Sequence, residues 1–346
     1  MTYIGVLSLL RRSMVTIREY VPLAPYTYFK IGGPARFFCE AHNETELFEA
    51  LYFARRKKVP FWIFGGGSNV LIADEGLPGL VIISRLNDLY EIDLYEIQSR
   101  KFDLYEIESR KLYAGAGVAM ARAVAASVAA GLTGLEWAIG IPGTIGGSAR
   151  GNAGCFGKEM KDVVESVEVF DTSCSSLRGA TPQLRGSDVA IQREERDCHA
   201  RLRLARNDCE FAYRESMFKH NTHLIILGAT LQLKKGNPEE SRKLIARYAK
   251  ERTEKQDIGA KCAGCMFKNV IPLNGGAIIP AGWLIDTAGC KGTRVGHAMV
   301  SEKHANYFLN CGGATAADVQ VLAALVKEKV KAFHGVALQE EIQYLY

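Results

Sequence analysis

Two cysteines separated by two residues have a spacing that could support chemistry. Cys262 and Cys265 have the C-x-x-C spacing of zinc sites and of redox-active disulfides. A zinc site would need a second pair, whereas Cys290 and Cys311 are too far apart and have no partner histidine motif. A thioredoxin-type pair would follow the first strand of a small βαβ unit, and this pair comes late. The spacing alone favours ordinary thiols, one of which could donate a proton, because a thiol with a pKa of about 8.5 is largely protonated at neutral pH.

An arginine beside a tyrosine could orient a carboxylate. Tyr213 and Arg214 lie within residues 211–220, and a guanidinium can bind a carboxylate through two parallel hydrogen bonds. The competing interpretation is a surface ion pair between Arg214 and Glu215. By spacing alone, the surface ion pair is favoured.

Two adjacent glutamates near the end of the chain are further candidates for acid–base chemistry. Apolar and polar side chains alternate over residues 336–345, which predicts a strand. In this pattern Glu341 lies on the polar face with Gln339 and Gln343, and Glu340 faces the apolar side unless it is paired. The alternation does not say which glutamate, if either, is catalytic.

Two glycine-rich loops could bind phosphate groups. The first is Gly65-Gly66-Gly67-Ser68-Asn69, and the second spans residues 140–147. Glycine lets backbone N–H groups approach an anion closely, and a run of such groups forms a phosphate-binding nest. Neither loop fits the Rossmann pattern or the P-loop. Each loop alone is typical of tight turns, but the two together favour a dinucleotide whose diphosphate spans two lobes.

The composition narrows the class of protein. The 346 residues allow two or three domains, and 48% apolar with 23% charged residues is the balance of a globular protein. The net charge of +5 is scattered, which fits anionic small molecules and argues against a nucleic-acid-binding protein. No stretch approaches the ~20 apolar residues of a membrane helix, and Arg11 and Arg12 follow the apolar N-terminal run, the reverse of a signal peptide. Nine cysteines at irregular spacing fit reduced thiols, so we expect a cytoplasmic protein without a metal site.

The sequence predicts a mixture of helices and strands. Asn43 and Glu46 form a capping box for a helix that places Leu47, Ala50, Leu51 and Ala54 on one face. Gly131 ends a helix over 118–130, and Gly335 ends one that begins at Thr315 or Asp318. A further helix is expected over 238–255. Strands are expected over residues 61–64, 70–72, 80–84, 163–170 and 224–233.

Two segments interrupt this order. The sequence Asp-Leu-Tyr-Glu-Ile occurs at 88–92, 93–97 and 103–107, and its alternation suggests hairpin strands. Three copies are too few for a solenoid. Residues 172–208 are polar, rich in arginine and without a clear period, and are expected to form a surface insertion.

The order of the pieces resembles that of one family, the UDP-N-acetylenolpyruvoylglucosamine reductases (MurB), which are flavoenzymes of peptidoglycan precursor synthesis. The resemblance covers about residues 21–346, and the direct passage from strand 224–233 into the last unit is similar to the shorter type II form. The matching blocks, besides the glutamate-containing end strand, are Thr27–Pro34, Gly65–Leu71, Gly115–Gly117, Gly140–Gly147, Asn152–Gly154, Phe211–Lys219, Ala263–Asn269, Ala281–Asp286 and Val300–Asn306.

The resemblance implies an α+β fold with a two-lobed FAD-binding domain of the PCMH/vanillyl-alcohol-oxidase type and a smaller α+β substrate-binding domain. The expected division is an N-terminal tail (1–20), lobe 1 (21–86), lobe 2 (87–236) and the substrate-binding domain with the C-terminal strand (237–346). Lobe 2 would include the repeat insertion (88–112) and the polar insertion (172–208). The residues expected to bind FAD are Gly65, Gly66, Gly67, Ser68, Asn69, Gly115, Gly117, Gly140, Ile141, Pro142, Gly143, Thr144, Gly146, Gly147, Asn152 and Gly154.

The family's activity implies roles for the candidate residues. NADPH would reduce the flavin and be replaced by the enolpyruvyl sugar nucleotide, and hydride would then pass from flavin N5 to C3 of the enolpyruvyl group. Arg214 matches the arginine that stabilises the developing negative charge, and Glu341 matches the carboxylate at the same centre. Cys265 stands where the family has a serine or cysteine that protonates C2. The residues expected to hold the UDP-sugar are Tyr213, Lys255, Asn269 and His304.

Several positions depart from the family pattern. Lys261-Cys262 replaces an expected Pro-Ser, Arg150-Gly151 precedes Asn152 where an apolar residue and Met are more usual, and His297 replaces a glycine. The end strand reads Gln-Glu-Glu instead of Glu-Pro-Glu. The alternatives are a related FAD-dependent oxidoreductase with another substrate, and a flavin-free scaffold or thiol protein whose loops are only turns. The sequence shows no exposed apolar helix or heptad repeat that would need to pack against a protein partner. We therefore expect a monomer that binds neither nucleic acid nor membrane.

Overall fold

The first unit is a four-stranded sheet covered by one helix. The computed structural model describes residues 15–92, 109–173, 201–272 and 276–346. The sheet order is β1-β2-β5-β3, with β1 antiparallel to β2 and the other neighbours parallel. Strand β1 begins inside the segment expected as a tail. The elements are β1 (Arg18–Pro22), β2 (Pro34–Ala41), β3 (Phe61–Phe64), β5 (Leu77–Ser84) and helix α1 (Glu44–Lys57).

Helix α1 forms as its sequence predicts. The Asn43 side chain accepts a hydrogen bond from the N–H of Glu46 at 3.0 Å, which satisfies one of the free donors at the start of the helix. The predicted face of Leu47, Ala50, Leu51 and Ala54 is buried against the sheet. The local pattern therefore determined both where this helix begins and which side it buries.

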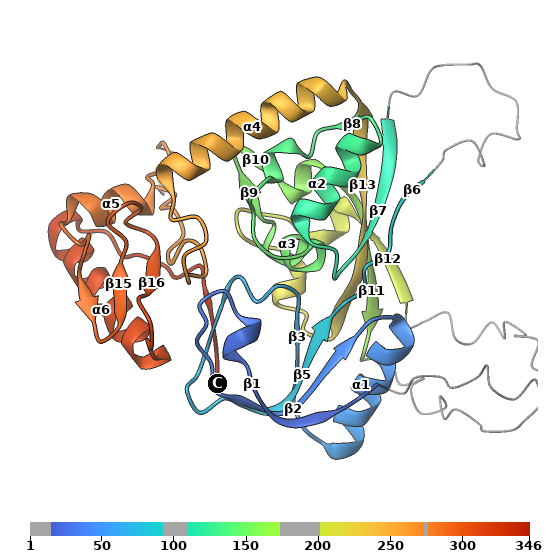
Figure 1. Ribbon diagram of the computed structural model, residues 1–346, viewed down its shortest axis with the longest axis horizontal. Helices are drawn as coiled ribbons and strands as arrows, with labels where there is room; N and C mark the ends of the chain where they lie inside the picture. Colours follow the sequence, from blue (N-terminus) through green and yellow to red (C-terminus); the bar gives the residue numbers. More distant parts are fainter. Residues whose placement is uncertain (1–14, 93–108, 174–200, 273–275) are drawn as a thin grey trace, which may run out of the picture.

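The second unit is a larger antiparallel sheet in the order β12-β11-β13-β7-β6, and β8 pairs with β13. Helices α2 and α3 lie over one face of this sheet, and α4 runs from it towards the third unit (Figure 1). Gly131 follows α2 with a φ of +68°, as predicted for the residue after a helix. The elements are β6 (Leu89–Ile92), β7 (Ser109–Gly115), α2 (Met120–Ala129), β8 (Leu132–Thr133), α3 (Ile145–Gly151), β11 (Val164–Asp171), β12 (Arg201–Ala205), β13 (Leu224–Lys235) and α4 (Pro238–Lys255).

The two predicted insertions both contribute strands to this sheet. Residues 201–205, expected as part of a surface insertion, form β12 and pair with β11 from Ser166 to Phe170. The sequence pattern does not indicate this strand, because β12 is an exposed edge strand held by pairing with β11 and not by burial of an apolar face. In the repeat, β6 pairs with β7 as the predicted hairpin requires. Residues 93–108 and 174–200 lie outside the described part of the chain.

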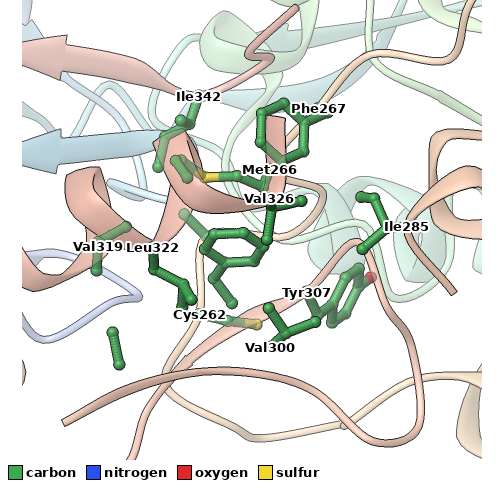
Figure 2. Close-up of a cluster of buried hydrophobic side chains, with 14 of the residues drawn as sticks. Cys262, Met266, Phe267, Ile285, Val300, Tyr307, Val319, Leu322, Val326 and Ile342 are labelled. Atoms are coloured by element: carbon green, nitrogen blue, oxygen red, sulfur yellow. The ribbon is translucent and has the colours of Figure 1, made fainter. Parts of the chain in front are cut away.

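The third unit packs a small sheet against two helices. The sheet order is β14-β15-β16, and Figure 2 shows Val319, Leu322 and Val326 of α6 in the cluster of buried side chains that these elements share. Thr315 and Asp318 form the capping box of α6, and Gly335 ends it with a φ of +70°. The elements are α5 (Ala281–Thr287), β14 (Arg294–Val295), β15 (Ala298–Val300), β16 (Phe308–Asn310) and α6 (Ala316–His334).

The end of the chain joins the third unit to the first. Strand β17 (Gln343–Leu345) is parallel to β4 (Val70–Ile72). The predicted strand over 336–345 is therefore shorter than expected, because residues 339–341 pair with residues 266–268 before the chain changes partner. Parallel pairing brings Glu341 directly beside the first glycine loop.

Shorter elements complete the description. Among the described helices, none is both long and apolar enough to cross a membrane. The two-residue strands are β9 (Gly154–Cys155) and β10 (Lys158–Glu159), and the short 3₁₀ helices are Ala24–Tyr26, Glu136–Ala138, Met160–Asp162, Arg206–Cys209 and Met217–Lys219.

We predict that the β17 pairing is required for stability. The N–H of Gln343 donates to the Asn69 carbonyl at 3.1 Å, and a Gln343→Pro substitution removes that donor. We expect the free energy of unfolding to fall by about 1–3 kcal/mol, because the carbonyl loses its partner. Gln343→Ala keeps the N–H and is the control. Equal stability of the two variants in chemical denaturation would contradict the prediction.

Candidate active site

The two glycine loops, 74 residues apart in sequence, lie against each other. The Ser68 hydroxyl donates to the Pro142 carbonyl at 3.2 Å. A Cβ on Gly66 would lie only 2.8 Å from the Cα of Gly143, and Gly143 itself has a φ of +107°, which other residues rarely adopt. Only glycine at both positions allows this contact. The loops therefore form one structure, as a ligand that spans both would require.

The meeting loops leave a set of backbone donors free. None of the N–H groups of residues 66–69, or of Gly143 and Thr144, donates a hydrogen bond to another residue of the described chain. By contrast, the N–H of Gly146 donates to Ala116 and that of Gly147 to the Thr144 hydroxyl. Free N–H groups on two facing loops fit the oxygens of a diphosphate.

The other glycines predicted to bind FAD position the chain. The N–H of Gly115 donates to Asp88 and the N–H of Gly117 donates to Leu86, both at 2.9 Å or less. The N–H of Ile141 donates to the Ala138 carbonyl at 3.1 Å. These backbone hydrogen bonds fix the chain segments next to the two loops.

A strained turn presents the Arg214 side chain. Arg214 has a φ of +55°, a conformation that costs a residue with a side chain about 1 kcal/mol or more. The fully buried Asn152 side chain donates to the Ala212 carbonyl at 2.8 Å and so holds the turn from one side. A guanidinium nitrogen of Arg214 donates to the Gly154 carbonyl at 3.2 Å. Asn152 and Gly154, predicted to bind FAD, therefore contact the arginine turn directly.

Arg214 forms an ion pair with Glu341. Its Nε lies 2.7 Å from a Glu341 carboxylate oxygen, and both side chains are at least four-fifths buried. The backbone of Glu341 is fixed on two sides: its N–H donates to Met266 at 2.8 Å, and its carbonyl accepts from the Asn69 side chain at 3.2 Å. The pair thus lies where the first glycine loop meets the third unit.

Burial controls the electrostatics of this pair. It raises the pKa of the Glu341 carboxyl, although the nearby Arg214, Lys219 and Lys268 oppose the shift. Burial alone would lower the pKa of Arg214, but the Glu341 carboxylate together with Tyr213, Cys265 and Glu159 more than offsets this, so the arginine stays charged. A buried guanidinium with one carboxylate partner can bind a second carboxylate from a ligand with little solvent competition.

Cys265 lies beside the pair and carries a proton. Its backbone pairs with Tyr307. Burial raises the pKa of its thiol to about 12, with Glu341 acting in the same direction and Arg214 against it. The thiol is therefore protonated at neutral pH, which suits a proton donor. Cys262 and Cys265 are both free thiols, and the described residues include no group of three or more histidine, cysteine or acidic side chains arranged to hold a metal ion.

The structure brings three of the four predicted UDP-sugar residues to this region. The Tyr213 hydroxyl accepts from the N–H of Asn269 at 3.2 Å. The His304 ring lies against Tyr307, the partner of Cys265, and its buried Nδ1 has no partner among the described residues. Burial lowers the pKa of His304. Lys255 is not brought to them: its exposed side chain pairs with Glu251 at 2.7 Å.

A buried arginine one turn before Lys255 was missed by the sequence analysis. Arg252 is 9% exposed, and its guanidinium donates to the Cys155 sulfur at 3.3 Å. Its Nε has no hydrogen-bond partner, and no acidic side chain of the described chain lies within ion-pair distance. Gly140 of the second loop makes room for it, since a Cβ there would lie 2.8 Å from Nε. A buried charge without a counter-ion is costly, so this arrangement fits an anionic ligand.

These features define a FAD-binding oxidoreductase. Residues 35–177 match the family model of a FAD binding domain, and the free donors of the two loops fit the diphosphate of that cofactor. Residues 256–345, which carry Cys265 and Glu341, match the C-terminal domain of UDP-N-acetylenolpyruvoylglucosamine reductase. The chain belongs to the UDP-N-acetylenolpyruvoylglucosamine reductase family.

Individual relatives agree along nearly the whole chain. A reductase of that name from Synechococcus sp. is 36% identical over 330 residues, which is 95% of this chain and 91% of the relative. One from Anoxybacillus flavithermus is 33% identical over 337 residues, 97% of this chain and 96% of the relative. The crystal structure of the Thermus caldophilus enzyme superposes with a TM-score of 0.66 at 30% identity, covering 96% of this chain and 99% of that one. The α+β fold predicted from the resemblance is confirmed.

We predict that Arg252 binds an anionic group of FAD or of the sugar nucleotide. Arg252→Met keeps an unbranched apolar stem but removes the charged guanidinium group. We expect the affinity for FAD or for UDP to fall about tenfold or more, while the ligand-free protein is no less stable, because a buried unpaired charge has been removed. Equilibrium binding and thermal unfolding measure the two effects. Arg252→Lys is the charge-retaining control, and unchanged affinity for both ligands in Arg252→Met would disprove the prediction.

Proposed function

We propose that this chain reduces the enolpyruvyl group of UDP-N-acetylglucosamine enolpyruvate to give UDP-N-acetylmuramate, a reaction of peptidoglycan precursor synthesis, with FAD as cofactor and NADPH as hydride donor. The observation that carries the proposal is the buried Arg214–Glu341 ion pair beside the protonated Cys265 thiol. Glu341 lies at the first of the two loops that fit a diphosphate, because its carbonyl accepts a hydrogen bond from the Asn69 side chain. Reduction of an enolpyruvyl group needs a cation for the carboxylate and an acid for the adjacent carbon, and this site contains both.

The residues divide the reaction between them. Bound FAD supplies the hydride that adds to C3 of the enolpyruvyl group. Arg214 binds the substrate carboxylate and stabilises the negative charge that develops there, which in a buried site is usually the largest contribution to catalysis. Cys265 donates its proton to C2, and the thiolate that remains lies beside Arg214. Glu341 holds Arg214 in place at 2.7 Å before the substrate arrives.

FAD is assigned to the two glycine loops, and the UDP-sugar is assigned to the side of the third unit. We assign the FAD diphosphate to the free N–H groups of residues 66–69 and 143–144, with Gly65 and Pro142 completing the loops. Tyr213, Asn269 and His304 are proposed to hold the UDP-sugar on the side of the third unit. Lys255 stays a prediction for the UDP phosphates, and its exposed side chain pairs with Glu251 at 2.7 Å.

The unit boundaries and the state of the protein complete the proposal. We propose lobe 1 as 21–86, lobe 2 as 87–236 and the substrate-binding domain as 237–346, with one sheet at the centre of each. Since one chain supplies Arg214, Cys265 and Glu341, we also propose that the enzyme acts as a monomer. The seven described cysteines are free thiols, which supports a cytoplasmic location.

An anaerobic visible spectrum tests the proposed function. We expect the purified protein to be yellow, to lose its absorbance on addition of NADPH, and to recover it on addition of the enolpyruvyl sugar nucleotide. Absorbance that is lost but not recovered would point to a related flavoenzyme with another substrate. A colourless protein from flavin-replete cells would favour the flavin-free alternative.

We predict that Cys265 is the proton donor. Cys265→Ala should retain FAD and its reduction by NADPH, but slow reoxidation by the sugar nucleotide by about 10²–10⁴-fold, the usual contribution of a general acid. Cys265→Ser, which keeps an O–H donor, should recover part of the rate. Because the thiol pKa is about 12, the wild-type reoxidation rate should not fall from thiol ionisation between pH 7 and 10. Full activity in Cys265→Ala would exclude this role.

A further inference from the structure

Three consecutive residues of the arginine turn each contact the third unit. The Tyr213 hydroxyl accepts from Asn269, the Arg214 Nε pairs with Glu341, and the Glu215 carboxylate accepts from the Lys268 ammonium group at 2.9 Å. We call these contacts the clasp. They join lobe 2, which positions Arg214, to the segment that holds Cys265, three residues before Lys268. The relative position of the Arg214 guanidinium and the Cys265 thiol depends on these contacts.

Substrate binding uses two of the three contacts. In the proposed reaction Arg214 binds the substrate carboxylate in addition to Glu341, and the Tyr213 hydroxyl, which accepts from the backbone N–H of Asn269, is assigned to the UDP-sugar. Glu215 and Lys268 have no ligand role in this scheme. Their contact is the member of the clasp that persists while the substrate is bound.

Glu215 also neutralises two neighbouring cations. The same carboxylate oxygen lies 3.4 Å from the Lys219 ammonium group, which in turn donates to the Arg214 carbonyl. Lys219 and Lys268 are about four-fifths buried or more, and Glu215 is two-thirds buried. The lysines hold the pKa of Glu215 below its ordinary value against the effect of burial. Without that carboxylate, two buried ammonium groups would repel each other across the junction.

We propose that Glu215 is a positioning residue for the reduction: it binds Lys268 and Lys219 so that Arg214 and Cys265 keep their relative positions while Arg214 and Tyr213 bind the substrate. This inference rests on the proposed function. It assigns to Glu215 an effect on the step that needs Arg214 and Cys265 together, and not on flavin binding or on flavin reduction.

Half-reaction kinetics of Glu215→Gln test the inference. We expect the rate of flavin reoxidation by the sugar nucleotide to fall about 10- to 100-fold, since small displacements of reacting groups have effects of this size. Flavin content and the rate of reduction by NADPH should stay within about twofold of wild type. The double variant Glu215→Lys with Lys268→Glu keeps the charges of the cluster and should recover reoxidation relative to Glu215→Lys alone.

Asp286→Asn is the matched control, because it removes one surface ion pair of the third unit, with Lys291 at 2.6 Å, and should leave both half-reactions unchanged. Reoxidation by Glu215→Gln at the control rate would overturn the inference. So would an equal loss in both half-reactions together with lost flavin, which marks a purely structural role. If wild-type protein is not reoxidised by the sugar nucleotide at all, the proposed function itself fails, independently of Glu215.

Discussion

The buried ion pair between Arg214 and Glu341 is the interaction on which the arrangement of the site depends. Two charges withdrawn from water are costly unless each is held in good geometry. Here Gly154 accepts from the arginine, while Met266 and Asn69 fix the backbone of the glutamate. Residues separated by more than a hundred positions must therefore meet within hydrogen-bond distance. The three units are arranged so that they do.

The same constraint accounts for features that look irregular in isolation. Arg214 adopts a left-handed backbone conformation because the turn is held by Asn152 on one side and by the third unit on the other. Such strain persists only where surrounding contacts overcome it, and it concentrates at functional sites. The last residues leave the third unit to pair with β4, which places Glu341 beside Asn69. The strained backbone of Arg214 and the change of pairing partner near the end of the chain both help to position the Arg214–Glu341 ion pair.

Much of the fold could be predicted because its determinants are local. The capping boxes at Asn43 and Thr315, the glycine that ends α2 and the apolar face of α1 are relations between residues within one or two turns. The sequence pattern was less informative where pairing between strands distant in sequence determines the structure. Strand β12 was not foreseen within the segment expected as a surface insertion, and the end strand was expected to be longer, because their partners lie elsewhere in the sequence.

The same division between local and long-range determinants applies to the site. The sequence by itself determined which groups could act, since the types and order of Arg214, Cys265 and Glu341 and the two glycine loops resemble a single family. Only the tertiary structure decided which charges are buried. Helix α4 is charged along its length, so nothing in its pattern separates Arg252, buried beside Gly140, from the exposed Lys255 one turn later. Burial depends on what packs against a residue from distant parts of the chain, and it is burial that keeps the Cys265 thiol protonated and makes the Arg214 charge effective.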